Sequence, residues 1–379
     1  MSDFADKPLS SKPMHWASAA LFVAALVIAF LRLPDPGDPR FAPVTAAASV
    51  KLPTAPTGDN LPAIAPVAGP ASLALLPDGR VAAAWLAGPD DDESAAVIWF
   101  ATLGRDGWSA PQVATKREST AAGTLAHLNK LGRPVLFAEG SWLHVWYESL
   151  TLGSWAGAAI VHSASTDGGK SWSKAERLPT SALGTLGSGL GGPPLALADG
   201  GIALPLDQRR PGQGSELLRL SATGRVIDKI RLGPAAAGRQ PAVVALDEKR
   251  AIAIPTGDGS TRRALLSSDG GQHWAAVAGF DLPGPATPLA LLRLGSGKLL
   301  LAGNPPRGRE SLQLWLSADD GHSWTLQHTV EAAADGAAEF TYPALLQASD
   351  GHIHLAYTWR RQRIKHLAFS EAWLEAARP

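Results

Sequence analysis

Apolar and polar positions recur in a unit of about fifty residues that starts near residue 71. Each unit holds an apolar run, a short polar turn and a second apolar run, as in SLALLPDGRVAAAW around Asp78 and ALLQASDGHIHLAYT around Asp350. Equivalent turns follow one another at intervals of 62, 59, 49, 48 and 54 residues, with the inner four at Gly140, Asp199, Glu248 and Ser296. Each unit predicts a β-hairpin. Six such units predict an all-β, six-bladed β-propeller over residues 71–374.

A different pattern precedes the repeats. Residues 16–31 carry no charge, and as a helix they would extend about 24 Å against a bilayer core of roughly 30 Å. We predict an uncleaved transmembrane helix at residues 16–33 after an N-terminal tail at 1–15; a cleaved signal peptide and a buried helix are the alternatives. Residues 34–70 hold nine prolines and predict an extended Pro-rich linker. The expected location is the bacterial inner membrane, single-pass, with the propeller in the periplasm or outside.

The composition narrows the possible partners and chemistry. Lys and Arg number 34 and Asp and Glu number 34, and this balance argues against nucleic acid as a partner. The chain has no cysteine, which excludes disulfides, thiolate metal sites and cysteine nucleophiles. His352 and His354 alternate onto one strand face but lack a matched third ligand. We therefore predict no metal and no cofactor.

A second motif recurs after three of the hairpins. It reads STDGGKSW at residues 165–172, SSDGGQHW at 267–274 and SADDGHSW at 317–324, so its copies are 102 and 50 residues apart. The aspartates Asp167, Asp269 and Asp319 can accept backbone N–H bonds across a turn, glycine permits a positive φ, and tryptophan packs into the blade. These residue types predict a turn with a structural role.

The motif matches the Asp-box, Ser/Thr-x-Asp-x-Gly-x-x-Trp, and residues 62–374 resemble the sialidase (neuraminidase) superfamily of BNR/Asp-box repeat proteins. Residues 357–366 resemble the closing strand pair of bacterial predicted neuraminidases. The resemblance implies retaining glycoside hydrolysis. In this superfamily an arginine cluster binds the substrate carboxylate, a tyrosine with a nearby glutamate is the nucleophile, and an aspartate is the acid/base.

The resemblance assigns each role to a position of this chain. Tyr342, in FTYPAL at residues 340–345, matches the nucleophile, and a tyrosine packed between blades is the alternative. Asp91 and Asp92 lie in the loop that matches the acid/base position, although four adjacent carboxylates are also typical of a solvated loop. The candidate anion contacts are Arg309, with Arg307 second, and Arg360 and Arg363 near the C-terminus.

Three positions depart from the superfamily pattern. The Arg-Ile-Pro motif before the first blade is replaced by Ala68-Gly69-Pro70, and Gln240-Pro241 replaces the Glu-Pro pair that carries the base. The clamp arginine of the fourth blade falls on Pro255 or Thr256, where Arg239 or Arg262 are possible substitutes. Gln240 is kept as a substrate contact. The predicted function is a membrane-anchored, sialidase-like exo-glycosidase acting on an extracytoplasmic saccharide. The alternative is a non-catalytic Asp-box propeller that binds glycan or protein.

Overall fold

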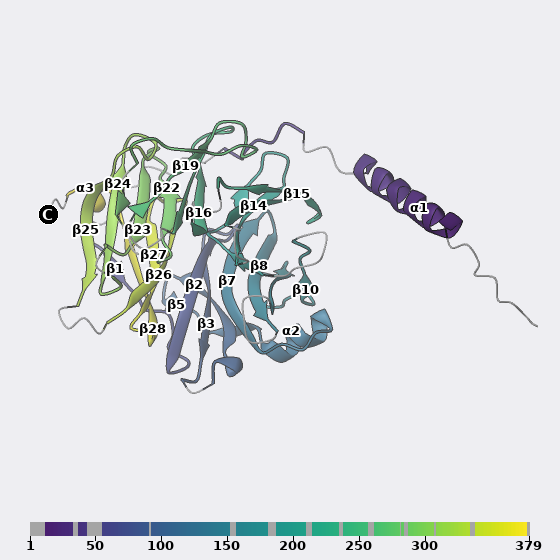
Figure 1. Cartoon of the computed structure of the whole chain (residues 1–379). Helices are drawn as coiled ribbons and strands as arrows, with labels where there is room; N and C mark the ends of the chain where they lie inside the picture. Colours follow the sequence, from purple (N-terminus) through teal and green to yellow (C-terminus); the bar gives the residue numbers. More distant parts are fainter. Residues whose placement is uncertain are drawn as a thin grey trace, which may run out of the picture. The chain divides into compact units, whose positions relative to one another are not determined.

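The computed structural model describes residues 12–32, 37–43, 55–90, 92–151, 157–180, 187–209, 214–234, 238–256, 261–280, 282–283, 287–306, 308–333 and 338–376. The chain divides into two compact units, Met1–Gly37 and Asp38–Pro379. The first unit contains helix α1 (Lys12–Leu31), and the second contains all the strands (Figure 1).

The N-terminal helix corrects the predicted location. Among the described residues, no helix is both long enough and apolar enough to span a membrane. This finding contradicts the transmembrane helix predicted at residues 16–33, the membrane contact and the single-pass location in the bacterial inner membrane. The physical reason is that the continuous apolar run of α1 extends only from Trp16 to Leu31, about 24 Å of a core of roughly 30 Å, since the first turn of the helix contains Lys12 and His15.

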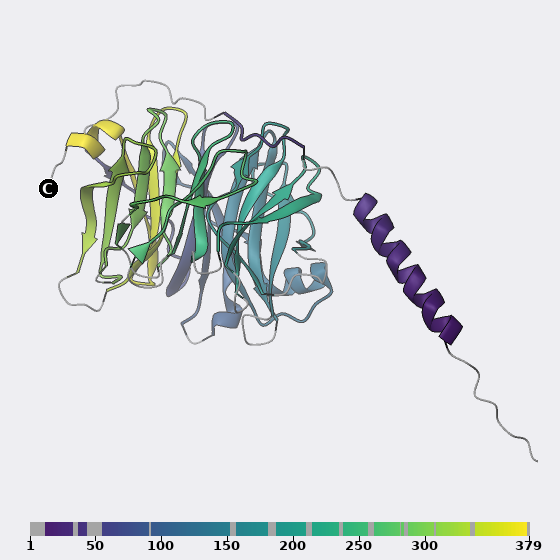
Figure 2. The ribbon, with the colours of Figure 1, turned by 45° about the horizontal axis from the view of Figure 1, so that its top comes forward.

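The second unit confirms the predicted all-β, six-bladed propeller (Figures 1 and 2). Blade one contains β2 (Val67–Leu75), β3 (Val81–Gly88), β4 (Val97–Gly104), β5 (Gly107–Trp108) and β6 (Gln112–Thr115). Blade two contains β7 (Lys130–Glu139), β8 (Trp142–Leu150), β9 (Ala158–Ser165) and β10 (Glu176–Arg177). Blade three contains β11 (Ser188–Leu190), β12 (Leu195–Ala196), β13 (Ile202–Gln208), β14 (Ser215–Leu220) and β15 (Val226–Arg231).

The remaining blades follow the same antiparallel order. Blade four contains β16 (Arg239–Ala245), β17 (Ala251–Thr256), β19 (Leu265–Ser267) and β20 (Ala275–Ala276), with β18 (Thr261–Arg262) and β21 (Leu282–Pro283) paired beside it. Blade five contains β22 (Ala290–Arg293), β23 (Leu299–Gly303), β24 (Ser311–Ser317) and β25 (Thr325–Ala332). Blade six contains β26 (Phe340–Gln347), β27 (Ile353–Trp359), β28 (Arg363–Phe369) and β1 (Thr57–Gly58). Short helices are the 3₁₀ turn η1 (Glu93–Ala95), α2 (Arg117–Thr124) and α3 (Glu371–Ala376).

The last blade takes its outer strand from the N-terminal side of the chain. Thr57 and Gly58 pair with Ala368 and Leu367 of β28, and the N–H of Leu61 donates to the carbonyl of Ile364 at 3.1 Å. Strand β2 begins at Val67. The described residues between 55 and 70 therefore belong to the propeller, although the proline content of 34–70 predicted an extended spacer.

Apolar packing joins each blade to the next. Six clusters of buried side chains lie between neighbouring blades, one for each pair around the ring. The cluster between blades six and one contains Leu61, Trp85 and Ile364, so the segment beside β1 also contributes to closure. Because burial of apolar area is the main favourable term in folding, these six interfaces hold the ring together.

The three Asp-boxes form the same hydrogen-bonded turn. In the first copy Asp167 Oδ1 accepts the N–H of Ser171 at 2.9 Å, and Ser165 Oγ accepts the N–H of Gly169 at 2.9 Å. Gly169 has φ of +90° and packs so closely on Phe100 of blade one that a Cβ would lie 2.2 Å from its ring. Burial alone would raise the pKa of Asp319, but hydrogen bonds from Ser323 and Ser317 outweigh this effect and lower the pKa to about 2. The geometry supports a structural role for the boxes.

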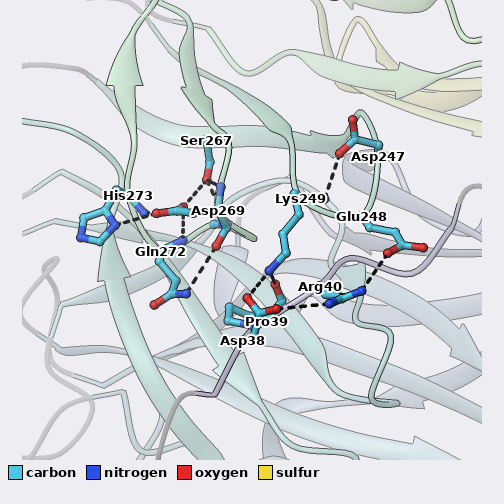
Figure 3. A network of polar contacts seen from close by, with 11 residues as sticks. Asp38, Pro39, Arg40, Asp247, Glu248, Lys249, Ser267, Asp269, Gln272 and His273 are labelled. Carbon is cyan, nitrogen blue, oxygen red and sulfur yellow. Dashed lines mark hydrogen bonds and ion pairs between the residues drawn. The ribbon is translucent and has the colours of Figure 1, made fainter.

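A strap of residues 38–43 crosses blades three and four at the second Asp-box (Figure 3). Phe41 is fully buried, and its N–H donates to the carbonyl of Glu248 at 2.8 Å. The ammonium of Lys249 contacts the carboxylate of Asp38 and donates to the carbonyl of Pro39 at 3.2 Å. At Gly270 a Cβ would lie 1.9 Å from the Pro39 carbonyl oxygen, so only glycine admits the strap there.

Blades two and six carry equivalent pairs of histidines. His144 and His162 are 2.9 Å apart at their ring nitrogens, as are His354 and His366. Burial lowers the pKa of His354 to about 3 and that of His366 to about 4. These rings are therefore neutral in the folded protein at neutral pH.

We expect the free energy of unfolding to fall as the pH falls from about 6.5 to about 4. The unfolded imidazoles take up protons in this range and the folded ones do not, so the unfolded state gains stability at about 1.4 kcal/mol per pH unit for each of the two histidines. Urea unfolding at pH 4.5, 5.5 and 6.5 measures the slope. The His354→Leu/His366→Leu variant should reduce it, whereas replacement of the exposed His127 by Gln should not. Equal slopes in all three proteins would contradict this expectation.

Phe41→Ala is expected to lower the free energy of unfolding by about 3–5 kcal/mol, because it removes a fully buried ring from the core between blades three and four. Urea unfolding monitors the loss. Arg40→Ala is the matched control in the same strap. Its ion pairs with Asp38 and Glu248 are long, at 3.4 Å, and half exposed, so a change within about 1 kcal/mol is expected. Similar losses in the two variants would show that the strap does not act through Phe41.

Candidate active site

A cavity of about 460 Å³ lies at one end of the propeller, where inner strands begin and second strands end. Its walls come from strands of blades one, two, four and six and from the loops that follow the second strands of blades three and five, which carry Arg209 and Arg309. The Asp-box turns lie at the opposite end, because each third strand runs back from the cavity before its turn. The structural turns and the cavity are therefore separated by the length of the blades.

A repeated bulge in the inner strands sets the rim of the cavity. The register of β2, β7, β16 and β26 with the next strand shifts just before or at a proline in each case. The residues that precede these prolines, Gly69, Arg133, Gln240 and Tyr342, all line the cavity. Proline cannot donate a ladder hydrogen bond, so the strand bulges and redirects the preceding side chain. Four blades thus present one equivalent position each to the same space.

Backbone strain gathers at the same place. Of the six non-glycine residues with positive φ in the described part of the chain, Gln240 (45°), Tyr342 (51°) and Arg361 (57°) line the cavity. Arg360 (51°) is adjacent to Arg361. Such conformations are unfavourable by about 1–3 kcal/mol each and persist mainly at functional sites. The cavity is therefore the strongest candidate for a functional site.

Positive charge predominates in the cavity wall. Five cationic side chains and three carboxylates line it: Arg133, Arg209, Arg309, Arg361 and Lys130 against Glu93, Glu148 and Glu339. An excess of guanidinium groups suits an anionic ligand, because each can donate two parallel hydrogen bonds to a carboxylate.

Two buried carboxylates hold part of this arginine cluster in place. Glu148 is almost fully buried; it accepts hydrogen bonds from Arg209 at 2.6 Å and from the N–H of Leu190 at 2.9 Å. Asp207 is fully buried and lies between Arg209, at 3.5 Å, and Arg239, at 2.9 Å. Burial alone would lower the pKa of Arg209, but Glu148 and Asp207 outweigh it and raise the pKa. Arg209 is thereby fixed as a charged wall of the cavity.

The positive charge of Arg133 is less fully balanced by neighbouring carboxylates. Burial lowers the pKa of its guanidinium, and the charge of Glu148 only partly opposes this effect. Arg133, Glu148 and Tyr342 all line the cavity.

The loop between β3 and β4 of blade one brings a carboxylate to the cavity. Glu93, the first residue of η1, forms an ion pair with Lys130. The Lys130 hydrogen bond and charge, with a smaller contribution from Arg361, hold the pKa of Glu93 below its ordinary value. Glu93 is thus ionised in the cavity as it stands at neutral pH.

The structure brings some of the predicted site residues together and separates others. Tyr342, Gln240 and Arg309 line the cavity, and Arg309 lies 3.5 Å from Glu339. Asp92 is exposed, lies outside the cavity lining, and accepts the N–H of Ser94 at 2.8 Å as the cap of η1. Asp91 and Arg307 lie outside the described residues.

The C-terminal arginines lie on two different surfaces. Arg360 and Arg361 both have positive φ in the turn between β27 and β28, so strand alternation does not apply to them. Arg361 lines the cavity, whereas Arg360 and Arg363 lie over the Trp359 ring, each 5.0 Å from its centroid.

Neither suggested substitute for the fourth-blade arginine lines the cavity. Arg239 pairs with Asp207, and Arg262 is buried and donates to the carbonyl of Thr287 at 3.2 Å. Sequence reasoning missed Arg133, Glu148, Arg209, Arg361 and Glu93 as cavity residues. A signal existed for Arg133, because Gly132-Arg133-Pro134 places an arginine directly before a proline at the start of an inner strand. Within the described ranges, no group of three or more His, Asp or Glu side chains is placed to hold a metal ion.

Comparisons with solved structures identify the fold. Trypanosoma rangeli sialidase, solved with sialic acid, superposes with a TM-score of 0.67 at 14% identity, covering 90% of this chain and 61% of the sialidase. The NanB sialidase of Streptococcus pneumoniae gives 0.61 at 12% identity, covering 82% and 69%. The intramolecular trans-sialidase of Ruminococcus gnavus gives 0.60 at 13% identity, covering 82% and 96%. At these identities the likeness shows the fold, and the chain spans 57–61% of the trypanosomal sialidases.

Sequence comparison shows the family. No curated protein sequence matches the chain significantly. The sequence pattern of the BNR repeat-like domain matches residues 79–355, which is well over half of the chain. The match agrees with the Asp-boxes and with the six-bladed, sialidase-like fold. The chain therefore belongs to the family of BNR repeat-like domain proteins.

Proposed function

We propose that the cavity is the active site of a retaining glycoside hydrolase that acts on a saccharide bearing a carboxylate. The observation that carries the proposal is Tyr342, which is held in a left-handed conformation on the rim of an arginine-lined cavity. The fold and the BNR repeat-like family support glycoside hydrolysis by analogy.

Arg133, Arg309 and Arg361 would bind the carboxylate of the substrate. They reach the cavity from blades two, five and six, and no short ion pair in the described part of the chain occupies them. Arg209 would act differently, because Glu148 and Asp207 already hold it. Bidentate contacts would fix the orientation of the sugar, with its anomeric carbon toward Tyr342.

Tyr342 would attack the anomeric carbon through its phenol oxygen and form a covalent glycosyl intermediate. Gln240 cannot take the phenol proton, since an amide is not a base at neutral pH. Glu148 would take it, because it lies in the same cavity and retains free lone pairs beside its bonds to Arg209 and Leu190. Water would then hydrolyse the intermediate with overall retention of configuration.

Glu93 would protonate the leaving oxygen. It is ionised at neutral pH because Lys130 and Arg361 favour its charged form. A substrate carboxylate bound to Arg361 would offset the charge of that arginine and add a negative charge nearby, and both effects would raise the pKa of Glu93 and allow it to serve as the acid. Asp91, in the same loop, remains the other proposed acid.

A non-catalytic glycan-binding propeller is the second candidate. It is favoured by Gln240 and Ala68, which line the cavity at positions where the superfamily pattern has a glutamate and an arginine. Such a protein would bind the acidic saccharide without hydrolysing it.

Tyr342→Phe is expected to lower kcat by at least about 10³-fold, because the nucleophilic oxygen is removed. The measurement is turnover of fluorogenic glycosides, including a sialoside and uronides, by the full chain. Gln240→Ala, which alters the equivalent rim position of blade four and removes only a substrate contact, should lower kcat far less. Equal activity of Tyr342→Phe and the native protein would refute the nucleophile. Binding of acidic sugars without any turnover would favour the second candidate.

Glu93→Gln is expected to lower kcat by about 10²–10⁴-fold for glycosides with poor leaving groups, and less for aryl glycosides that leave without a proton. Asp92→Asn changes the adjacent carboxylate, which caps η1 outside the cavity, and should leave kcat within about threefold. The two variants and Asp91→Asn are compared over pH 4–8. If Asp91→Asn shows the leaving-group dependence and Glu93→Gln does not, Asp91 is the acid.

A further inference from the structure

A second cationic surface lies beside the cavity on the β27–β28 hairpin. The charged groups of Arg360, Arg363 and Lys365 each lie 5.0 Å from the centroid of the Trp359 ring. We call these four residues the Trp359 cluster. Thr358 and Arg361, which stand on either side of Trp359 and Arg360 in the chain, line the cavity. The cluster and the cavity mouth are therefore neighbours on one hairpin.

The charges of the cluster are only partly balanced. Lys365 Nζ lies 2.6 Å from Glu331 Oε1, so its charge is compensated. Within the described ranges, neither Arg360 nor Arg363 has a carboxylate within ion-pair distance, and both are exposed. Two like charges held over one indole repel each other, while the ring attracts each of them. An anion that bridges the two guanidiniums would relieve the repulsion.

The backbone holds this arrangement at a cost. Arg360 and Arg361 occupy consecutive left-handed positions, with φ of 51° and 57°, where glycine or asparagine is the unstrained choice. The turn sends Arg361 into the cavity and Arg360 onto Trp359. A strained turn that supplies one arginine to each of two adjacent surfaces is typical of a functional segment.

We propose that the Trp359 cluster is a second anion subsite, which binds the next acidic unit of a saccharide whose first carboxylate occupies the cavity. The indole orients the planar guanidiniums, and their N–H edges remain available for bidentate bonds to a carboxylate or sulfate. The binding of the first carboxylate in the cavity rests on the proposed function. The substrate class is then an oligosaccharide with successive acidic units rather than a neutral chain with one terminal acidic sugar.

Calorimetric titration of the full chain with acidic sugars of two lengths tests the subsite. The probes are the monomer and trimer of α1,4-linked galacturonic acid and of α2,8-linked sialic acid. The native protein should bind one of the trimers about tenfold or more tightly than its monomer. Arg360→Ala/Arg363→Ala should abolish this preference and leave monomer binding within about twofold. Arg105→Ala/Lys174→Ala is the control: it removes the same charge from exposed positions near the turns of the opposite end, and should change neither affinity.

Three results would overturn the subsite: no preference for either trimer, no binding of any acidic trimer, or an equal loss of monomer and trimer affinity in the double variant. Tripolyphosphate distinguishes a saccharide site from a general anion site. If its affinity falls as much as that of the trimer, the saccharide assignment fails.

Arg360→Gly separates function from folding. Glycine relaxes the left-handed backbone, so we expect the thermal midpoint to rise while the trimer preference falls. A purely structural Arg360 would leave the trimer preference unchanged, which would overturn its role. Turnover of monomeric glycosides tests the cavity separately. A trimer preference without turnover would contradict only the proposed hydrolysis, whereas turnover without a trimer preference would contradict only the subsite.

Discussion

Closure of the ring is the constraint on which the rest of the molecule depends. Each blade buries one apolar face against the blade before it and one against the blade after it, and six such interfaces form a closed set. The last interface joins segments more than three hundred residues apart, because β1 completes the sheet of β28 and Leu61 packs with Ile364. Without that contact two blades would expose their apolar faces, and the cavity would lose the wall that β26 and β2 form together.

The closed ring is stiff, and it departs from regular strand geometry where the candidate chemistry lies. Prolines interrupt four inner strands at equivalent positions, and the residue before each of them turns toward the axis. Each of these four bulges therefore presents one residue to the same cavity. In this chain those side chains are absent at Gly69, cationic at Arg133, an amide at Gln240 and a phenol at Tyr342. The scaffold fixes the positions, and the residue types at these positions determine the chemistry.

Electrostatics divides the cavity arginines into two groups. Glu148 and Asp207 neutralise Arg209 in a buried network, which makes that arginine part of the wall. Arg133 and Arg361 have no such partner among the described contacts, and Arg309 has a long, exposed one. An incoming carboxylate would thus meet guanidiniums that no short ion pair neutralises and that are still able to donate hydrogen bonds. In the proposed mechanism, the same ligand would raise the pKa of Glu93, whose charged form Lys130 now favours, and anion binding would thereby be coupled to the protonation of this carboxylate.

Local sequence determined the blades and the Asp-boxes, because alternating apolar runs, turn glycines and a short capped turn depend on neighbouring residues alone. It also indicated Tyr342, Gln240 and Arg309, since each stands next to a recognisable local pattern. It could not indicate Glu148 or Arg209. Their roles depend on the ion pair between them, which joins two blades, and on the contact of Arg209 with Asp207. It gave no sign of β1, because a two-residue strand is too short to show a period. The charge-free run at residues 16–31 predicted a helix but did not determine whether that helix lies in a membrane. Tertiary structure decided which arginines enter the cavity, because only ring closure and a left-handed turn separate Arg361 from Arg360 and Arg363.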